Sequence, residues 1–533
     1  MIIVDPITLG DTSFTRPSPK HVYDRFGALV QVPSNTLGVT YDPADLSKAP
    51  WALLEAAATN IALQSETFND VQWGKNGVTV SPNTIAAPNG ALTADKLVES
   101  FSSSGHYVDQ TITINGNAQY TRSIFVKAGE RGQVRLEMYS VPTVGVRANI
   151  SFDIASGTFF GEASATGVVQ TYSALRLPNG WWRIFQTFNL GTADTSCFFR
   201  ICLLGPGGAS VYQGDGTSGA YVWGAMMGEG SYIATTSAAA TRAADVVGSA
   251  AGLLYSNVPI TEPDYSAAAT YAKDALVHDP ATHNVFKSLI DANKGKPLTD
   301  PAAWNPRGAT NRWAMLDQYN NTQTANPEEI LIVLMPQAIS EGLYIGNCDA
   351  DEIELSVVDQ SEGLVASEVT SLVTASGTSS YFDWCFRPAD RSDYFVTTSM
   401  PPYANALVLV AIRKPGGVPK CGMLAIGAVD EFGPSLYGLS AEGKDYSSTT
   451  FNFDGTTNTE IRPYAKRMSV DVQVDNSEID YIQRKLFQIR QRPIVWIGGP
   501  YGATAVFGRY GSFKIVIPGL KKSDMALQIE GSV

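Results

Sequence analysis

Apolar and polar residues alternate with a period of two along much of the chain between residues 60 and 247. In one run, Val134, Leu136 and Met138 alternate with polar or charged residues. A strand that is buried on one face shows this pattern, because successive side chains of a strand point to opposite faces. Several such runs are separated by turns rich in glycine, serine and asparagine. The segment 60–247 therefore predicts a β-sandwich.

Two further runs in this segment predict particular strands. Residues 152–159 read as two strand ends joined by a turn, with Gly157 in the turn, and so predict a hairpin. Residues 197–203 are apolar on both faces of the expected strand, at Cys197 and Phe199 as well as at Phe198 and Cys202. A strand with two apolar faces is covered on both sides, so we expect it to be central.

The rest of the chain divides by composition into four further parts. Residues 1–59 carry six prolines, which interrupt any long element, and we expect an N-terminal arm or leader. Small residues predominate in a linker at 248–263, and 264–310 forms a small β module. Residues 311–533 are mostly strands and predict a domain that anchors or oligomerises the protein.

One helix is expected in the last of these parts. A start of the capping-box type at residues 477–480 precedes an apolar stripe at helical spacing, and Pro493 ends it. The stripe consists of Ile479, Ile482, Leu486 and Ile489. The predicted fold class is therefore mainly β and multidomain: a jelly-roll sandwich, a small β module, and a β-rich C-terminal domain with one long helix.

Composition narrows the classes of function. A chain of 533 residues is too long for one core, and 44% hydrophobic with 17% charged residues is typical of globular proteins. The net charge of −13 would repel phosphates, so we expect no nucleic-acid partner. The chain start shows no signal-peptide pattern, and the longest apolar runs, at 330–335 and 407–412, have the length of strands. We therefore expect no membrane insertion and no secretion by the general route.

The five cysteines are scattered and include no C-x-x-C pair. This usage is typical of buried thiols in a reducing cytoplasm rather than of a disulfide framework.

Three motifs fit a cofactor site by their letters but not by their context. Residues 214–219 match G-x-G-x-x-G, but a strand rather than a helix is expected to follow, so we interpret them as a glycine turn in a hairpin. His278 and His283 flank a turn without the second pair of ligands that zinc requires. The acidic run 349–354 lacks the spacing of a calcium loop and is interpreted as a solvated loop. We expect no cofactor and no metal.

Catalytic chemistry finds little support in the sequence. A G-x-S-x-G elbow is absent from it, and its 51 acidic residues do not single out the opposed carboxylate pair of a glycosidase. We therefore expect a protein that is not an enzyme.

Aromatic residues are the better candidates for function, because flat rings pack on the C–H faces of sugars while their polar atoms bind hydroxyls. The carbohydrate-binding candidates are Trp73, Tyr107, Trp181, Trp182, Tyr212 and Trp223 in the sandwich, and Tyr271 and Trp304 in the small module. For any single ring, the alternative is a place in a core. Trp181 and Trp182 are adjacent, so in a strand they point to opposite faces and at most one lies in the core of a simple sandwich. The other is then exposed or covered by a partner.

Several segments together resemble a known group of proteins. The opening at 60–68, the turn and strand at 212–223 and the run 241–246 resemble the jelly-roll, carbohydrate-binding-type module of bacteriophage tail and neck proteins. The segment 264–307, with Asn293-Lys-Gly295-Lys-Pro297 and a later tryptophan, resembles a degenerate chitin-binding-type module. The leader and the C-terminal region resemble the corresponding parts of the same phage proteins.

The resemblance implies a structural protein of a phage virion, without catalytic residues, in the collar, neck or tail. It implies other virion proteins as partners, assembly in the bacterial cytoplasm, and lectin-like modules that contact host-surface polysaccharide weakly and multivalently. A closed homotrimer is the symmetry we favour. Two alternatives stay open: a purely architectural virion component that binds no sugar, and a tail enzyme that degrades polysaccharide.

Overall fold

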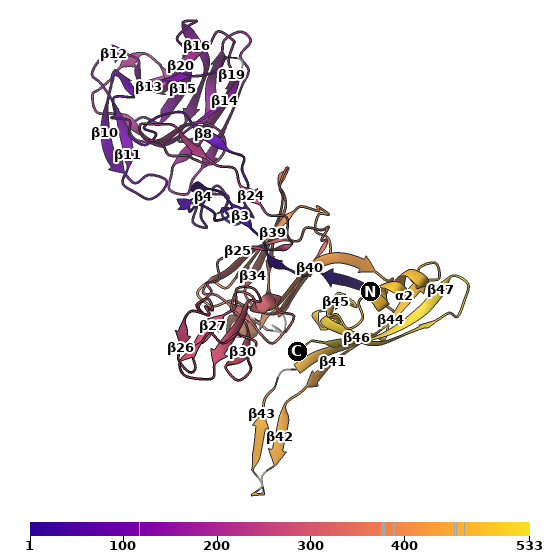
Figure 1. The fold of residues 1–533 in the computed structure, drawn as a ribbon. Helices are drawn as coiled ribbons and strands as arrows, with labels where there is room; N and C mark the ends of the chain where they lie inside the picture. The colour runs from indigo at the N-terminus through magenta and orange to yellow at the C-terminus, as the bar shows by residue number, and fades with distance from the viewer. Residues whose placement is uncertain are drawn as a thin grey trace. The chain divides into compact units, whose positions relative to one another are not determined.

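A computed structural model describes the chain as mainly β and multidomain, which confirms the predicted fold class. It describes residues 1–116, 118–374, 380–386, 390–451, 453–454, 456–462 and 464–532. By their contacts, the residues form two compact units (Figure 1). The sandwich unit comprises Phe14–Val247, and the terminal unit comprises Met1–Ser13 together with Gly248–Val533. Most of the segment expected as a leader, residues 14–59, thus lies in the same unit as the sandwich.

The sandwich unit contains two six-stranded antiparallel sheets. The β14 sheet has the order β10 (Val78–Ile85), β11 (Ala94–Glu99), β22 (Gly219–Met227), β14 (Gln119–Ala128), β19 (Trp182–Asn189), β18 (Gln170–Arg176). The β15 sheet has the order β17 (Thr158–Ser164), β16 (Gly145–Asp153), β15 (Gln133–Ser140), β20 (Ser196–Leu203), β13 (His106–Thr113), β9 (Gly74–Asn76). The chain crosses repeatedly between the two sheets, as in a jelly roll.

The strands predicted from alternating polarity are present. Val134, Leu136 and Met138 of β15 are buried in the core between the sheets, while the residues between them are half-buried. Strand β20 lies between β15 and β13, which confirms its predicted central place. Strands β16 and β17 form the predicted hairpin, and Gly157 adopts a φ of 71° in its turn. A side chain there would also meet the Trp182 ring, at 2.5 Å from an added Cβ.

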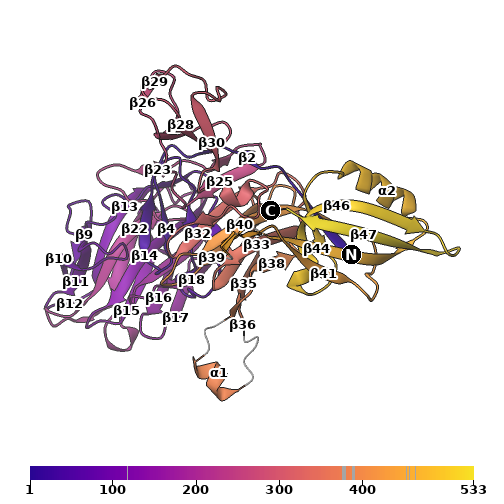
Figure 2. The same ribbon diagram turned by 90° about the horizontal axis from the view of Figure 1, so that it is seen from below.

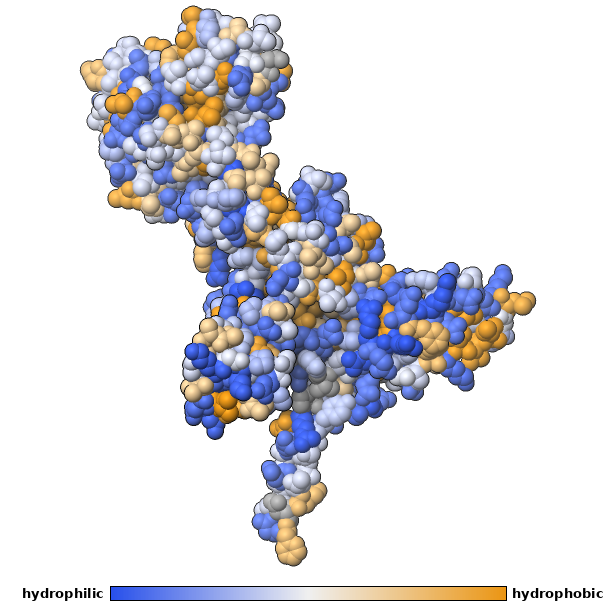
Figure 3. Space-filling view, viewed as in Figure 1, coloured by the Kyte–Doolittle hydropathy of each residue, from blue (hydrophilic) through white to orange (hydrophobic). Residues whose placement is uncertain are grey.

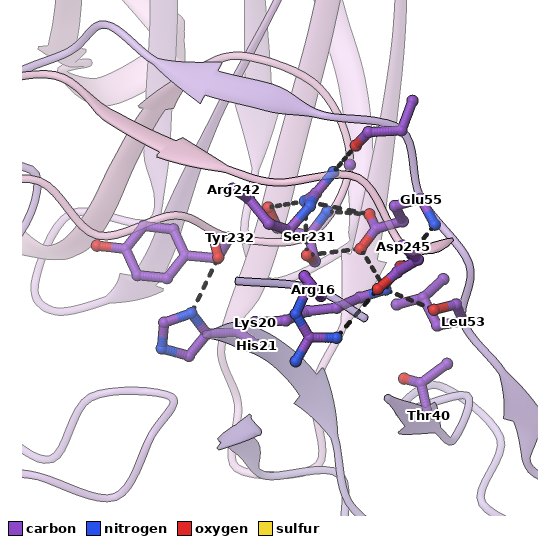
Figure 4. Close-up of polar contacts among 12 residues, drawn as sticks. Arg16, Lys20, His21, Thr40, Leu53, Glu55, Ser231, Tyr232, Arg242 and Asp245 are labelled. Carbon is purple, nitrogen blue, oxygen red and sulfur yellow. Dashed lines mark hydrogen bonds and ion pairs between the residues drawn. The ribbon is translucent and has the colours of Figure 1, made fainter. Parts of the chain in front are cut away.

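A buried ionic network fixes the leader within the sandwich unit (Figure 4). Asp245 accepts hydrogen bonds from Arg16 Nη1 at 3.1 Å and from Lys20 Nζ at 2.7 Å, and all three side chains are fully buried. Lys20 also pairs with Glu55 at 2.9 Å, and Glu55 pairs with Arg242 at 3.3 Å. Removing one member of such a buried network leaves an uncompensated charge, which costs about 3–5 kcal/mol. The network therefore holds three distant segments of the chain together.

The terminal unit contains a ten-stranded and a six-stranded sheet. The first has the order β38 (Tyr394–Thr397), β33 (Gly342–Asp349), β40 (Lys420–Glu431), β1 (Ile2–Pro6), β45 (Ile494–Ile497), β46 (Ala505–Val516), β47 (Lys522–Gly531), β44 (Tyr464–Asp475), β41 (Ser440–Asp445), and β31 (Thr324–Ala325) also pairs with β40. The second has the order β2 (Gly10–Asp11), β25 (Gly252–Ser256), β32 (Glu329–Met335), β39 (Leu407–Arg413), β34 (Glu352–Asp359), β35 (Gly363–Ser371). Strand β1 pairs with both β40 and β45, so the N-terminal residues lie inside the larger sheet.

The predicted helix is present as α2 (Ile479–Gln488) and lies against strands β46 and β47 of the larger sheet (Figure 2). Ile482 and Leu486 of its apolar stripe are buried in a cluster with Trp496. Its start differs from the prediction. Glu478 is the N-cap residue, and within residues 464–532 no side chain makes a capping hydrogen bond to this end.

Residues 264–310 form a small β subdomain within the terminal unit. Its strands are β26 (Thr270–Tyr271), β27 (Leu276–His278), β28 (Asn284–Ser288), β29 (Asn293–Lys294) and β30 (Trp304–Ala309). Val277, Ala303 and Trp304 form a small core, on which Tyr265 and Tyr271 pack.

A β-hairpin projects from the terminal unit as a continuation of β41 and β44 (Figure 1). It is formed by β42 (Ser448–Phe451) and β43 (Thr457–Glu460). Phe451 and Phe453 near its tip are almost fully exposed, and the tip is hydrophobic in the space-filling view (Figure 3). A two-stranded hairpin is only marginally stable in water. Packing of this hairpin against another surface would therefore stabilise it.

All five cysteines are free thiols; four are buried, as expected, but Cys385 in the short helix α1 (Tyr381–Phe386) is exposed. Among the helices that the structure describes, none is long and apolar enough to cross a bilayer.

Candidate functional site on the outer face of the sandwich

Four of the eight aromatic candidates are enclosed in cores. Trp73, Trp181, Trp223 and Trp304 are at most 1% exposed. Their indole nitrogens donate to Gln64 O, Ala86 O, Thr93 Oγ1 and Lys296 O, respectively. A ring without accessible surface offers no face to a sugar, so these four rings act in packing.

The neighbours Trp181 and Trp182 point to opposite faces of the β14 sheet, as their adjacency requires. Trp182 packs partly buried against the core between the two sheets. Trp181 lies in a second apolar cluster on the other face, together with Tyr23 and Leu29 of the leader. One of the two rings was expected to be exposed or covered by a partner. Leader residues of the same chain cover it instead.

Tyr212 is half-buried and held in a polar network. Its hydroxyl donates to Glu99 Oε2 at 2.8 Å, and its ring lies 4.5 Å from that of His106. Arg131 binds both oxygens of Glu99, at 2.6 and 2.7 Å. Although burial alone would raise the pKa of Glu99, the hydrogen bonds from Arg131, from the Asp215 amide and from Tyr212 hold it below its ordinary value. These contacts give Tyr212 a structural role.

The glycine-rich segment 214–219 is a loop and not the turn of a hairpin. Strand β21 (Tyr212–Gln213) before it pairs with β12 (Ser103–Ser104), whereas β22 after it pairs with β11 and β14. The expectation that a strand follows the loop is confirmed. Gly219 is required by close packing, because an added Cβ would lie 1.8 Å from Leu97 O.

The remaining two candidates are half-buried. Tyr271 packs on the core of the small subdomain, with its ring centroid 5.4 Å from that of Trp304. Tyr107 lies on β13, on the face of the β15 sheet that points away from the core.

Tyr107 belongs to a regular array that we call the sheet-face grid. Three adjacent strands each contribute three outward side chains, in register across β13, β20 and β15. The rows are Tyr107–Cys202–Arg135, Asp109–Arg200–Glu137 and Thr111–Phe198–Tyr139. The inward side chains of the same strands fill the sandwich core, so the sheet fixes the positions of the outward ones.

The middle row is an ion-pair network. Arg200 lies between two carboxylates, with Nη2 at 3.1 Å from Asp109 Oδ2 and Nη1 at 2.7 Å from Glu137 Oε1. The three side chains are 13–15% exposed. Burial raises the pKa of Asp109 above its ordinary value, and the charge of Arg200 opposes this effect only in part.

Aromatic rings surround this central arginine. The guanidinium carbon of Arg200 lies 4.1 Å from the Tyr107 ring centroid, 5.1 Å from that of Tyr139 and 5.7 Å from that of Phe198. At these distances the cation is attracted to each ring. The rings of Tyr139 and Phe198 lie 6.2 Å apart and are tilted by 43°. All three aromatic side chains are half-buried.

This combination of rings and charged groups has the chemistry that non-covalent sugar binding requires. Ring surfaces offer packing for C–H groups, while the carboxylates and the guanidinium offer acceptors and donors for hydroxyl groups. Both acids of the grid bind the same guanidinium. A structural ion network has this arrangement, whereas a glycosidase holds two carboxyl groups across a substrate.

Sequence reasoning singled out only Tyr107 among the grid residues. It missed Arg135, Glu137 and Tyr139 on β15, Asp109 on β13, and Phe198 and Arg200 on β20. The available signal was the other half of the alternating pattern, since the residues between the core positions of a strand form its outer face.

Among the residues that the structure describes, no group of three or more His, Cys, Asp or Glu side chains is arranged to hold a metal ion. His283 stacks on Trp313 with ring centroids 3.8 Å apart, and His278 Nδ1 lies 2.8 Å from Glu262 O.

The acidic run 349–354 is not the expected solvated loop, because Asp349 ends strand β33 and residues 352–354 begin β34, and cations pair with its carboxylates. Asp349 pairs with Lys414 at 2.6 Å and Asp351 with Arg391 at 2.5 Å. Glu354 is buried and pairs with Arg413.

Comparison of the sequence with models of protein families and with curated proteins finds no match. Among solved structures, the chain is similar to the CBM22-1–CBM22-2 tandem domain of Xyn10C from Paenibacillus barcinonensis, with 8% identity and a TM-score of 0.21 over 70% of this chain and 100% of that one. The family 11 carbohydrate-binding module from Clostridium thermocellum, in complex with a β-1,3-1,4-mixed-linked tetrasaccharide, shows 10% identity and a TM-score of 0.14 over 30% of this chain and 100% of that one. The GH78 family rhamnosidase of Bacillus sp. GL1 shows 10% identity and a TM-score of 0.17, and the match covers 78% of this chain and 37% of the enzyme. With TM-scores this low, these similarities carry no argument about what this chain binds.

Proposed function

We propose that this chain is a structural, non-catalytic protein of a bacteriophage virion, and that its sandwich unit contacts host-surface glycans through the sheet-face grid. The observation that carries the glycan contact is the set of three half-buried rings around Arg200 on the outer face of the β15 sheet. The proposal that the chain belongs to a virion rests on the resemblance of the motifs at 60–68, 212–223 and 241–246 to bacteriophage tail and neck proteins.

The grid lies on the outer face of a sheet, and we expect each contact with a glycan to be weak. Several copies in one particle would raise the avidity without a strong single site. A closed homotrimer is the oligomer we propose, with other neck, collar or tail proteins as partners. The β42–β43 hairpin supports oligomerisation, because its exposed Phe451 and Phe453 gain from burial against another chain.

A purely architectural role is the second candidate, and one observation favours it. The charges of the middle row are paired with one another, so the face is satisfied electrostatically without a ligand. Such a face could pack on a neighbouring virion protein instead.

Two experiments test these proposals separately. Mass spectrometry of purified virions should detect the chain as a stoichiometric component, and its absence from particles would refute the place in a virion. A glycan array probed with the full-length protein should show saturable signals that the double variant Tyr139→Ala/Phe198→Ala loses. The control is Tyr172→Ala, which removes a more exposed ring from β18 in the other sheet. Absence of any signal favours the architectural role.

A further inference from the structure

The terminal unit contains a pocket of about 220 Å³ that is separate from the sheet-face grid. Its lining comes from β33, β44, β46 and β47, with further residues from the segments around 320 and 393. Strands β33 and β44 lie far apart in the order of the ten-stranded sheet, yet side chains from both line this pocket. The sheet therefore curls on itself, and the pocket lies inside the curl beside Gly531 and Ser532 near the C terminus.

Two polar side-chain atoms of residues that line the pocket lack hydrogen-bond partners among the described residues. Asn320 Oδ1 is buried and has no hydrogen-bond partner among the residues that the structure describes. Tyr344 is 4% exposed as a whole; its hydroxyl keeps some accessible surface and makes no hydrogen bond to any described residue. Leaving the buried Asn320 oxygen unsatisfied costs free energy, whereas the Tyr344 hydroxyl is free to bond a molecule in the pocket. One of the two atoms is an acceptor, and the other can donate.

The backbone around these groups is shaped to hold them there. An added Cβ at Gly346 would lie 2.5 Å from the Tyr344 hydroxyl. An added Cβ at Gly422 would lie 2.6 Å from Asn320 O. Asn347 adopts a φ of 49°, which few residues other than glycine adopt, and its amide donates to Asn320 O at 2.5 Å. Two glycines thus make room for Asn320 and Tyr344, and the Asn347 amide holds the Asn320 backbone.

The charges and walls of the pocket select for a neutral ligand with an apolar face. Asp393 and Lys466 both line it and pair with each other at 3.2 Å, so their charges compensate. Phe507 and Tyr464 add aromatic surface. The volume is below the roughly 300–1,000 Å³ of pockets that hold drug-sized ligands, and it suits a single ring.

We infer that this pocket binds one ring of a neutral polyhydroxylated ligand, namely a single sugar residue, with the Tyr344 hydroxyl donating to one of its hydroxyls and Asn320 lining the site. This site does not depend on the sheet-face grid. The sugar can be free or can be the terminal residue of a chain, and both present the same hydroxyl chemistry.

The test is a titration of the full-length protein with sugars, in which binding is monitored by saturation-transfer NMR. The probes are glucose, galactose and N-acetylglucosamine, their methyl glycosides, a short oligosaccharide ending in each, and glucuronate as a charged analogue. At least one neutral sugar should saturate the protein, and glucuronate should bind at least about tenfold more weakly. A preference for the oligosaccharide over the methyl glycoside identifies a chain end as the ligand.

The variants are chosen so that folding and binding separate. Tyr344→Phe and Asn320→Ala should each weaken binding at least about tenfold, and Tyr344→Phe should leave the unfolding midpoint unchanged because its hydroxyl bonds nothing inside the protein. The matched control is Tyr510→Phe, which removes a hydroxyl that donates to Leu486 O at 2.9 Å. This control should lose stability and keep its affinity.

Three outcomes overturn the inference: no sugar saturates the protein at concentrations up to about 100 mM, the two pocket variants bind as tightly as the parent chain, or Phe198→Ala alone abolishes all binding. The last outcome would assign every sugar contact to the sheet-face grid. Monosaccharide binding at this pocket, together with no glycan binding that depends on the grid residues, would instead refute only the proposed function.

Discussion

The guanidinium carbon of Arg200 lies 4.1 Å from the centroid of the Tyr107 ring, on the outer face of the β15 sheet. The two residues come from neighbouring strands, β20 and β13, and lie in adjacent rows of the same register. Arg200 is held from both sides by Asp109 and Glu137, so the position of the cation is fixed by the sheet. The aromatic surface of the grid therefore depends on this one arginine.

Substitution of Arg200 by leucine is predicted to destabilise the sandwich unit. Two partly buried carboxylates would face each other without their cation, at a cost of about 2 kcal/mol. Chemical denaturation monitored by tryptophan fluorescence measures this change. Adding Asp109→Asn and Glu137→Gln to the leucine variant should restore most of the loss. A leucine variant as stable as the parent would show that the ion pairs contribute nothing.

The leader network makes a prediction for Asp245. Asp245→Asn leaves Arg16 and Lys20, both fully buried, without a full countercharge, and should lower the free energy of unfolding by about 3–5 kcal/mol. The matched control is Asp42→Asn, which breaks the pair of the half-buried Asp42 with the exposed Lys48 and should cost at most about 1 kcal/mol. Equal effects of the two substitutions would contradict the structural role of the network.

Glu354 predicts a dependence of stability on pH in the terminal unit. Burial raises the pKa of Glu354 to about 8, and nearby Glu352 and Glu329 add to the effect while Arg413 opposes it. Because the folded state holds this proton more tightly than the unfolded chain, the stabilisation is present at low pH and is lost as the pH rises toward 8.

The measurement is the free energy of unfolding of the parent chain and of Glu354→Gln, determined between pH 5 and pH 8. The parent should lose more than about 1 kcal/mol over this range relative to the variant, which carries no titrating proton at this position. Parallel curves for the two proteins would mean that Glu354 is ionised throughout.

Gly219, the first residue of β22, makes a steric prediction. Alanine there would place its Cβ 1.8 Å from the Leu97 carbonyl oxygen, and backbone atoms cannot move aside as a flexible side chain can. Gly219→Ala should therefore cost at least about 2 kcal/mol of stability.

The control for this substitution is Gly132→Ala. Apart from Gly132 and its two chain neighbours, no described residue has an atom within 4 Å of an added Cβ at that position. Its unfolding midpoint should match that of the parent, with a change within about 0.5 kcal/mol. Equal losses from both alanines would show that general glycine effects, rather than the approach to Leu97, determine the result.

Local patterns predicted the local elements of the fold. Strand β15, the β16–β17 hairpin and helix α2 each depend on the polarity of neighbouring residues, which the sequence displays directly. The burial of Trp181 was not predictable in this way, because leader residues such as Tyr23 cover it from far along the chain. The partners of Arg16 and Lys20 lie 229 and 225 residues away, at Asp245.

The candidate site shows the same division. Alternation indicates that Glu137 and Arg200 point outward, but it does not reveal that β15 and β20 are adjacent and in register. Their salt bridge depends on that register. The pocket residues Asn320 and Tyr344 carried no recognisable motif, because their association requires the larger sheet to curl.

The central claim is that the sheet-face grid binds a glycan. Its most direct test is a titration of the full-length protein with the glycan that gives the strongest array signal. The full-length parent and the Tyr139→Ala/Phe198→Ala variant are compared, after thermal unfolding has shown that both are folded. The account predicts saturable binding by the parent and a loss of at least about tenfold in affinity for the variant. Equal affinities of the two proteins would contradict it.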